Sequence, residues 1–233
     1  MPDLPPLAHL TETRRSLHRV AEHVLSAALK TSTGHIALEQ SPGGFRTPPL
    51  ADGTVLAVDG AELVVTDNQG VRRAALTTVA DAARVAGTVA GFPWTKHPPA
   101  TELEPHARLF VDPASAEMLA GWFALGAQAL SALAAEIAGD QPGALKIYPE
   151  HFDLGMTAGD INYGVSPGDE AIPLPYLYVG PHEGPPARDD FWNAPFGAYT
   201  VITDISSADD ARAFFRVGRE RVHTARNHSR STA

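Results

Sequence analysis

Apolar residues first recur at helical spacing, in a segment that runs from about Thr11 to Lys30. Its apolar stripe consists of Leu17, Val20, Val24, Leu25 and Ala28. From His35 onward the period changes to short runs rich in Val, Leu and Ile, which are separated by turn residues such as Asp59-Gly60. These runs are His35–Gln40, Thr54–Val58, Glu62–Thr66 and Val71–Leu76. The pattern predicts a long helix followed by a small antiparallel meander.

Helix-capping and helix-breaking residues divide the middle of the chain. Thr78 and Asp81 have the spacing of a capping-box variant and predict a short helix that ends near Gly87. The stretch from Phe92 to Pro105 contains four prolines and no periodicity. We therefore expect a first domain over residues 1–91 and a proline-rich linker over residues 92–111.

The second half repeats this order of elements. Asp112-Pro113 predicts the start of a long helix that Gly139 ends, and Ser207 predicts the cap of a last helix. Strands are expected at Ala144–Tyr148, Phe152–Thr157, Ile161–Val165, Tyr176–Val179 and Ala198–Thr203. The expected fold class is α+β, with antiparallel sheets packed against long helices in two similar halves. The second domain would cover residues 112–225, and residues 226–233 would form a flexible tail.

Composition and charge narrow the class of protein. Hydrophobic residues make up 44% of the chain and charged residues 19%, which is typical of a folded globular protein. The formal net charge of −9 argues against nucleic acid and against an acidic membrane surface as partners. The absence of cysteine excludes disulfides, thiolate nucleophiles and Cys-ligated metals. The C-terminal arginines are interpreted as cations that complement a helix dipole.

Two further features bear on localisation. The N-terminal residues MPDLPPLAHL lack the basic and apolar regions of a signal peptide, so a cytoplasmic protein is expected. Residues Met118 to Ala135 carry no charge over nearly the length of a membrane span. Alanine is their commonest residue, however, and an evenly apolar helix of this kind is typical of a buried central helix. No membrane association is expected.

Candidate chemistry concentrates between Tyr148 and Gly197. This segment contains four of the five tyrosines of the chain, together with turn formers and scattered polar side chains. Aromatic walls with a few convergent polar groups are typical of small-molecule pockets, although aromatic residues can also simply cover a thin core. The predicted ligand-binding residues are Tyr148, His151, Asp153, Asn162, Tyr163, Tyr176, Tyr178, Trp192 and Asn193.

Two other functions remain open. His151 and Asp153 are two residues apart, so on a strand they would share a face, and His182 with Glu183 could complete a metal site for a hydrolase or lyase. The apolar long helix or the aromatic segment could instead form an interaction surface, including one for a homo-oligomer.

Familiar catalytic templates do not settle the choice. Asp153 with Asp169 or Glu170 could form an acid–base pair, but the sequence does not give their separation. Ser166 lacks the Gly-x-Ser-x-Gly context of a nucleophile elbow. Neither a catalytic residue nor a cofactor is identified, and the pattern does not decide whether the protein is an enzyme.

Four segments carry a resemblance: YPEHFDLGM, INYGVSPGDE, PYLYVGP and FWNAPFGAY. They are similar to an uncharacterised family of bacterial proteins and, more distantly, to a domain-of-unknown-function family. In the latter, a long helix precedes a strand with a His-x-Phe-Asp-like core, a Pro-Gly turn, a Tyr-rich strand and a terminal helix. The resemblance covers about Asp112 to Arg221. It implies where a site lies and says nothing of the chemistry there.

Overall fold

The computed structural model describes residues 4–91 and 98–231. It contains two five-stranded antiparallel sheets and several helices, which confirms the expected α+β class. The strand orders are β1-β2-β3-β4-β5 and β10-β9-β8-β7-β6, so each sheet follows chain order, as the predicted meanders require. The chain divides into two compact units, residues 1–124 with 146–153 and residues 125–145 with 154–233.

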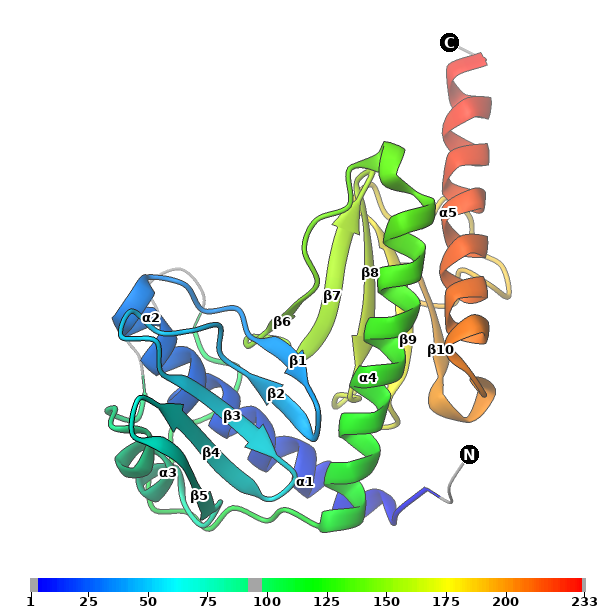
Figure 1. Cartoon of the computed structure of the whole chain (residues 1–233). Coiled ribbons are helices and arrows are strands. Elements are labelled where there is room, and N and C mark those ends of the chain that lie inside the picture. The colour runs from blue at the N-terminus through cyan, green and yellow to red at the C-terminus, as the bar shows by residue number, and fades with distance from the viewer. Residues whose placement is uncertain (1–3, 92–97, 232–233) are drawn as a thin grey trace. The chain divides into compact units, whose positions relative to one another are not determined.

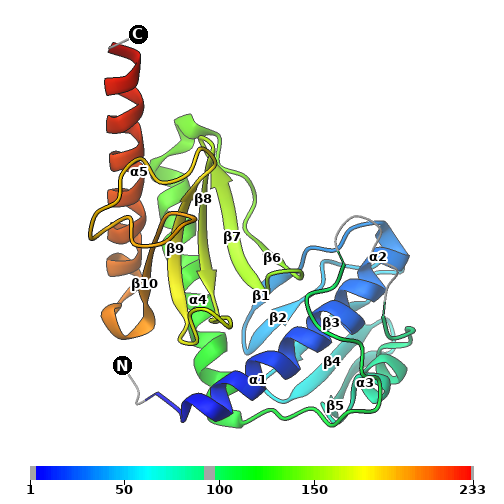
Figure 2. The ribbon, with the colours of Figure 1, turned by 180° about the vertical axis from the view of Figure 1, so that it is seen from behind.

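The first unit opens with a continuous helical run that the sequence predicts as a single helix. The run consists of α1 (Leu7–Val20), a π-helical segment η1 (Ala21–Ser26) and α2 (Ala27–Thr33). It ends at Gly34, whose φ of 83° is the left-handed conformation that glycine adopts without strain. All five residues of the predicted apolar stripe are buried, and the run crosses one face of the first sheet (Figures 1 and 2).

The first sheet consists of β1 (Glu39–Ser41), β2 (Gly44–Arg46), β3 (Val55–Asp59), β4 (Glu62–Asp67) and β5 (Gly70–Ala75). Cross-strand pairing sets its core: Leu56 lies opposite Val65 and Val58 opposite Leu63, and all four are buried. Later in the chain, β6 (Lys146–Tyr148) belongs to this unit, where Leu38 and Ile147 exchange backbone hydrogen bonds of 2.9 and 2.8 Å.

The capping-box prediction for α3 (Val79–Ala86) is confirmed. The Thr78 hydroxyl accepts a hydrogen bond of 3.0 Å from the Asp81 N–H, and Gly87 closes the helix with a φ of 69°. Hydrogen bonds from Arg84, Thr78 and Thr77, in that order, lower the pKa of Asp81 to about 2. The ionised carboxylate thus stabilises the helix start at a pH above the ordinary value of 3.8, and this contribution is lost as the pH falls through 2.

We expect Arg84→Gln to raise the pKa of Asp81 toward 3.8, because Arg84 makes the largest contribution to the shift. The rise should be incomplete, since the two threonine hydroxyls still donate to the carboxylate. An NMR titration of the Asp81 carboxyl measures it. Arg72→Gln, which removes a partner of Asp67 instead, should leave the Asp81 pKa at its starting value. An unchanged pKa in Arg84→Gln would contradict this account.

Helix α4 (Pro113–Glu136) spans the boundary between the units. The Asp112 carboxylate caps it by accepting from the Ser115 N–H at 2.9 Å and from the Ser115 hydroxyl at 2.8 Å. By length and composition alone, α4 could cross a membrane. The core helix of a soluble protein can meet the same two criteria. Leu119, Trp122, Leu130 and Leu133 on this helix are buried.

The second unit contains η2 (Ala138–Asp140), β7 (Asp153–Ala158) from Leu154 onward, β8 (Ile161–Ser166), β9 (Tyr176–Pro181), β10 (Ala198–Val201), η3 (Ile202–Asp204) and α5 (Ala208–Ser231). The Ser207 hydroxyl caps α5 by accepting from the Asp210 N–H at 3.1 Å, as predicted. The C-terminal part of α4 and α5 both pack on this sheet, since Gly126 of α4 touches Val165 and Gly218 of α5 touches Val179.

Two boundaries differ from those expected. The division between the units falls within α4 and not in the proline-rich segment, of which residues 92–97 lie outside the described residues. The segment after residue 225 is helical up to Ser231, because α5 continues without a break.

Candidate functional site

The residues predicted to bind a ligand do not belong to one unit. Tyr148, His151 and Asp153 lie in the first unit, and the other six lie in the second. His151 is exposed in a turn and not on a strand, since the N–H groups of His151 and Phe152 both donate to the Tyr148 carbonyl, at 3.1 and 2.7 Å. The prediction that His151 and Asp153 share a strand face is therefore wrong. Phe152, with a φ of 53°, turns the chain between them.

The second sheet separates the remaining tyrosines onto two faces. Tyr163 pairs with Val179 across the strands, and both point to the face that α4 and α5 cover. Tyr178 pairs with Gly164 and, like Tyr176, lies on the opposite face. The Tyr178 ring covers the space where Gly164 and its cross-strand partner Gly155 lack side chains. Tyr163 and the pair Tyr176–Tyr178 therefore do not line one pocket.

The other predicted residues of this unit have structural partners. The Asn193 side chain closes its loop on Tyr199, donating to the carbonyl at 3.0 Å and accepting from the N–H at 2.9 Å. Trp192 is buried with its ring edge-on to Phe191. Asn162 is exposed and contacts Nε2 of His182 through its Oδ1 at 3.1 Å.

The four residues of the predicted metal site are not gathered within one unit. His151 and Asp153 lie in the first unit, whereas His182 and Glu183 are exposed in the second. Across residues 4–91 and 98–231, no group of three or more His, Asp or Glu side chains could hold a metal ion. The described side chains offer no set of ligands on which to build metal chemistry.

A different cluster forms around Asp140 in the second unit. The carboxylate accepts two hydrogen bonds from the fork of Arg219, at 2.5 Å from Nε and 3.1 Å from Nη2. This pairing lowers the pKa of Asp140 and raises that of Arg219. Nε2 of His223 lies 3.6 Å from the same carboxylate. Because Arg219 and His223 are four residues apart on α5, they project from one face of the helix.

Arg226 extends the same helix face by one more turn. Its Nη1 donates to the Gly159 carbonyl in the β7–β8 turn at 2.8 Å, and the Gly159 N–H donates to the Asp140 carbonyl at 3.0 Å. Its Nε lies 3.9 Å from the carboxylate of Glu183, a side chain that is 78% exposed. Solvent screens so exposed a charge, so Glu183 offsets little of the positive charge of Arg226.

Three buried polar atoms in this cluster lack a hydrogen-bond partner among the described residues: Oη of Tyr163, Nη2 of Arg226 and Nε2 of His223. The last of these lies 3.6 Å from the Asp140 carboxylate, which is longer than a hydrogen bond, and it donates only in one tautomer. Tyr163 is fully buried, and its burial raises the pKa of the phenol despite the nearby charges of Arg219 and Arg226. Its hydroxyl therefore stays protonated at any physiological pH and can only act as a neutral donor or acceptor. Arg226 is permanently a donor.

A shallow groove adjoins the cluster. It has a volume of about 330 Å³ and is lined by Glu136, Ile137, Arg216, Arg219 and Glu220. Arg219 is common to the groove and to the cluster. Unsatisfied buried donors next to a fixed guanidinium are suited to binding an anion. We name Tyr163, His223 and Arg226 the donor site.

Of the donor site, the sequence pattern identifies only Tyr163. The helix-dipole interpretation of the C-terminal arginines does not point to a site at Arg226, and the sequence pattern assigns no role to His223. A usable signal was present, since positions 219, 223 and 226 recur at helical spacing and mark one face of α5. Asp140 could not be found in this way, because its partner Arg219 is 79 residues away.

Comparisons with protein-family models, with curated proteins and with solved structures find no match for this chain.

Proposed function

We propose that the protein binds a small anionic molecule in its second unit, through Tyr163, His223 and Arg226. The observation that carries the proposal is the pair of buried donors, Oη of Tyr163 and Nη2 of Arg226, that have no hydrogen-bond partner in the described part of the chain, with Nε2 of His223 beside them. A buried polar group left without a hydrogen bond costs about 1–3 kcal/mol. An anion with two or more oxygen atoms can accept from these donors and recover that cost.

The surrounding charges favour an anion over a neutral ligand. Asp140 neutralises Arg219 through its forked hydrogen bonds, so the charge of Arg226 remains for the ligand. Tyr163 adds a neutral hydroxyl, which donates without adding charge. The proposal keeps the expected small-molecule ligand and keeps Tyr163 from the predicted aromatic pocket, but it moves the site to the helix-covered face of the sheet.

Isothermal titration calorimetry with inorganic phosphate, sulfate and acetate tests this function. We expect at least one of these anions to bind the wild-type protein, and Arg226→Gln to weaken that binding at least tenfold. Tyr163→Phe should weaken it too, while leaving the unliganded protein as stable as the wild type or more so, because a buried unpaired hydroxyl is removed.

Arg221→Gln is the matched control. Arg221 lies on the same helix, is 46% exposed and pairs with Asp189 at 2.9 Å, outside both the donor site and the groove. Its substitution should leave the affinity unchanged. Equal affinities of wild type and Arg226→Gln, or no binding of any of the three anions, would show that the donors serve the fold alone.

A further inference from the structure

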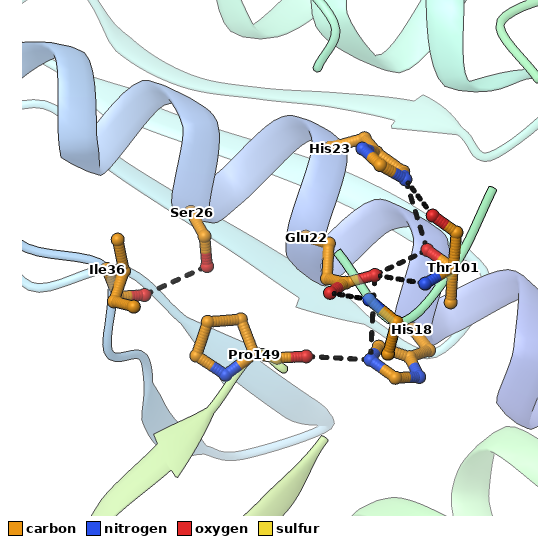
Figure 3. Close-up of polar contacts among 8 residues, drawn as sticks. His18, Glu22, His23, Ser26, Ile36, Thr101 and Pro149 are labelled. Atoms are coloured by element: carbon orange, nitrogen blue, oxygen red, sulfur yellow. Dashed lines mark hydrogen bonds and ion pairs between the residues drawn. The ribbon is translucent and has the colours of Figure 1, made fainter. Parts of the chain in front are cut away.

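The π-helical segment η1 in the first unit carries two fully buried ionisable side chains, Glu22 and His23, and His18 precedes them on the same helical run (Figure 3). A π-helical turn widens the backbone and is often found at functional sites. The widened turn leaves the His23 carbonyl able to accept from the Gly91 N–H at 2.9 Å. This polar cluster is independent of the donor site.

Glu22 binds the segment Ala100–Thr101, which lies far away in the sequence, to the helical run. Its two carboxylate oxygens accept from the N–H groups of Ala100 and Thr101, both at 2.8 Å, and from the Thr101 hydroxyl at 2.5 Å. Nε2 of His23 lies 3.0 Å from the Thr101 carbonyl, which can only accept, so this nitrogen carries the proton. Ala100 and Thr101 are thus held by two consecutive residues of the π-helical segment.

His18 lies between this segment and a second one. Its Nε2–H donates to the Pro149 carbonyl at 2.7 Å, and the same nitrogen lies 3.8 Å from the Glu22 carboxylate. The ring stacks on Phe152, with centroids 5.1 Å apart. Figure 3 shows Thr101 and Pro149 both reaching this cluster from outside the helix.

Burial opposes the charging of His18. Desolvation lowers its pKa from 6.5, the charge of Glu22 and the bond to Pro149 act in the opposite direction, and His23 and Arg14 add to the lowering. These charged groups come from the helical run itself. The packed segments contribute the Pro149 carbonyl and the Phe152 ring.

We propose that His18, Glu22, His23 and Thr101 form an acid-operated latch, in which protonation of His18 releases Ala100–Thr101 from Glu22 and uncovers the cluster to water. The latched state disfavours the His18 imidazolium by burying it, whereas the open state lets water solvate it. Because the pKa of His18 is lower in the latched state, acid favours opening, starting as the pH falls through 6.5.

The size of the effect follows from proton linkage. If His18 titrates at 6.5 in the open state and stays neutral in the latched state, the opening constant rises about tenfold between pH 7.5 and pH 5.5. The Ala100 and Thr101 amides report opening directly, because both donate to Glu22. Their hydrogen-exchange protection factors, corrected for the intrinsic pH dependence of exchange, are measured by NMR on the full chain.

We expect the protection of these two amides to fall about tenfold over this pH range, while the Val64 amide in β4 keeps its protection. His18→Gln keeps a side-chain donor toward Pro149 but cannot titrate, so it should abolish the fall. His9→Gln, at an α1 side chain that is 51% exposed, should retain it. Constant protection in the wild type, an equal fall at Val64, or a fall that persists in His18→Gln overturns the proposal. Because the Val64 amide is compared with the Ala100 and Thr101 amides within the wild-type protein, this test of the latch does not depend on whether a variant folds.

Discussion

Replacing Glu22 with glutamine is expected to lower the free energy of unfolding of the first unit by about 3 kcal/mol, since hydrogen bonds to a charged group contribute about 1.5–3 kcal/mol each. Both oxygens of Glu22 face donors: one accepts from Ala100 and the other from Thr101. Glutamine has one oxygen only, so its amide group would point N–H donors at backbone or hydroxyl donors. Urea unfolding followed by far-UV circular dichroism measures the loss.

Glu12→Gln is the matched control for this substitution. Glu12 lies on the same helical run, is 56% exposed and pairs with Arg15 at 3.0 Å. Exposed ion pairs of this kind contribute about 0–1 kcal/mol, so the control should unfold nearly as the wild type does. If Glu22→Gln proved as mild as Glu12→Gln, Glu22 would not be the residue that holds Ala100 and Thr101.

Gly126→Ala is expected to destabilise the second unit, although alanine normally favours a helix over glycine by about 1 kcal/mol. A Cβ at position 126 would lie 2.7 Å from Cγ1 and 2.9 Å from Cβ of Val165, a fully buried residue of β8. Because the Cβ of a strand residue cannot rotate away, α4 must shift from the sheet. Overpacking of this kind costs about 1–3 kcal/mol. Thermal unfolding by calorimetry should show a lower transition temperature.

Gly121→Ala on the same helix is the control, since a Cβ there meets nothing within 4 Å. It should therefore stabilise the protein by about 1 kcal/mol, opposite in sign to Gly126→Ala. Adding Val165→Ala to Gly126→Ala creates room for the new methyl group, so the double variant should lose less stability than the two single changes predict together. Shifts of the same sign at positions 121 and 126 would refute the packing argument.

The order of helices and strands could be predicted because it depends on local physics. The period of apolar residues, the hairpin turn at Asp59-Gly60 and the cap formed by Thr78 and Asp81 each act over a few residues. The same reasoning missed the π-helical turn at Ala21–Ser26. Its residues continue the apolar stripe of a normal helix, and the extra width serves contacts with residues that lie much later in the chain.

The candidate sites could be predicted only in small part, because they join distant residues. Glu22 meets Thr101 across 79 positions, and Arg226 meets Gly159 across 67. The spacing of apolar and polar residues near each partner does not indicate either pairing. The prediction for His151 and Asp153 assumed an extended chain, whereas Phe152 takes a left-handed conformation that a sequence pattern does not signal at a phenylalanine.

The Tyr178 ring lies over two glycines on neighbouring strands, Gly155 and Gly164. A single side chain from β9 thereby fills the space above the glycines of both β7 and β8. A protein that diverged from this one could not enlarge either glycine independently, because the space is already filled from β9. We would therefore expect positions 155, 164 and 178 to change together, with a smaller residue at 178 accompanying any larger residue at 155 or 164.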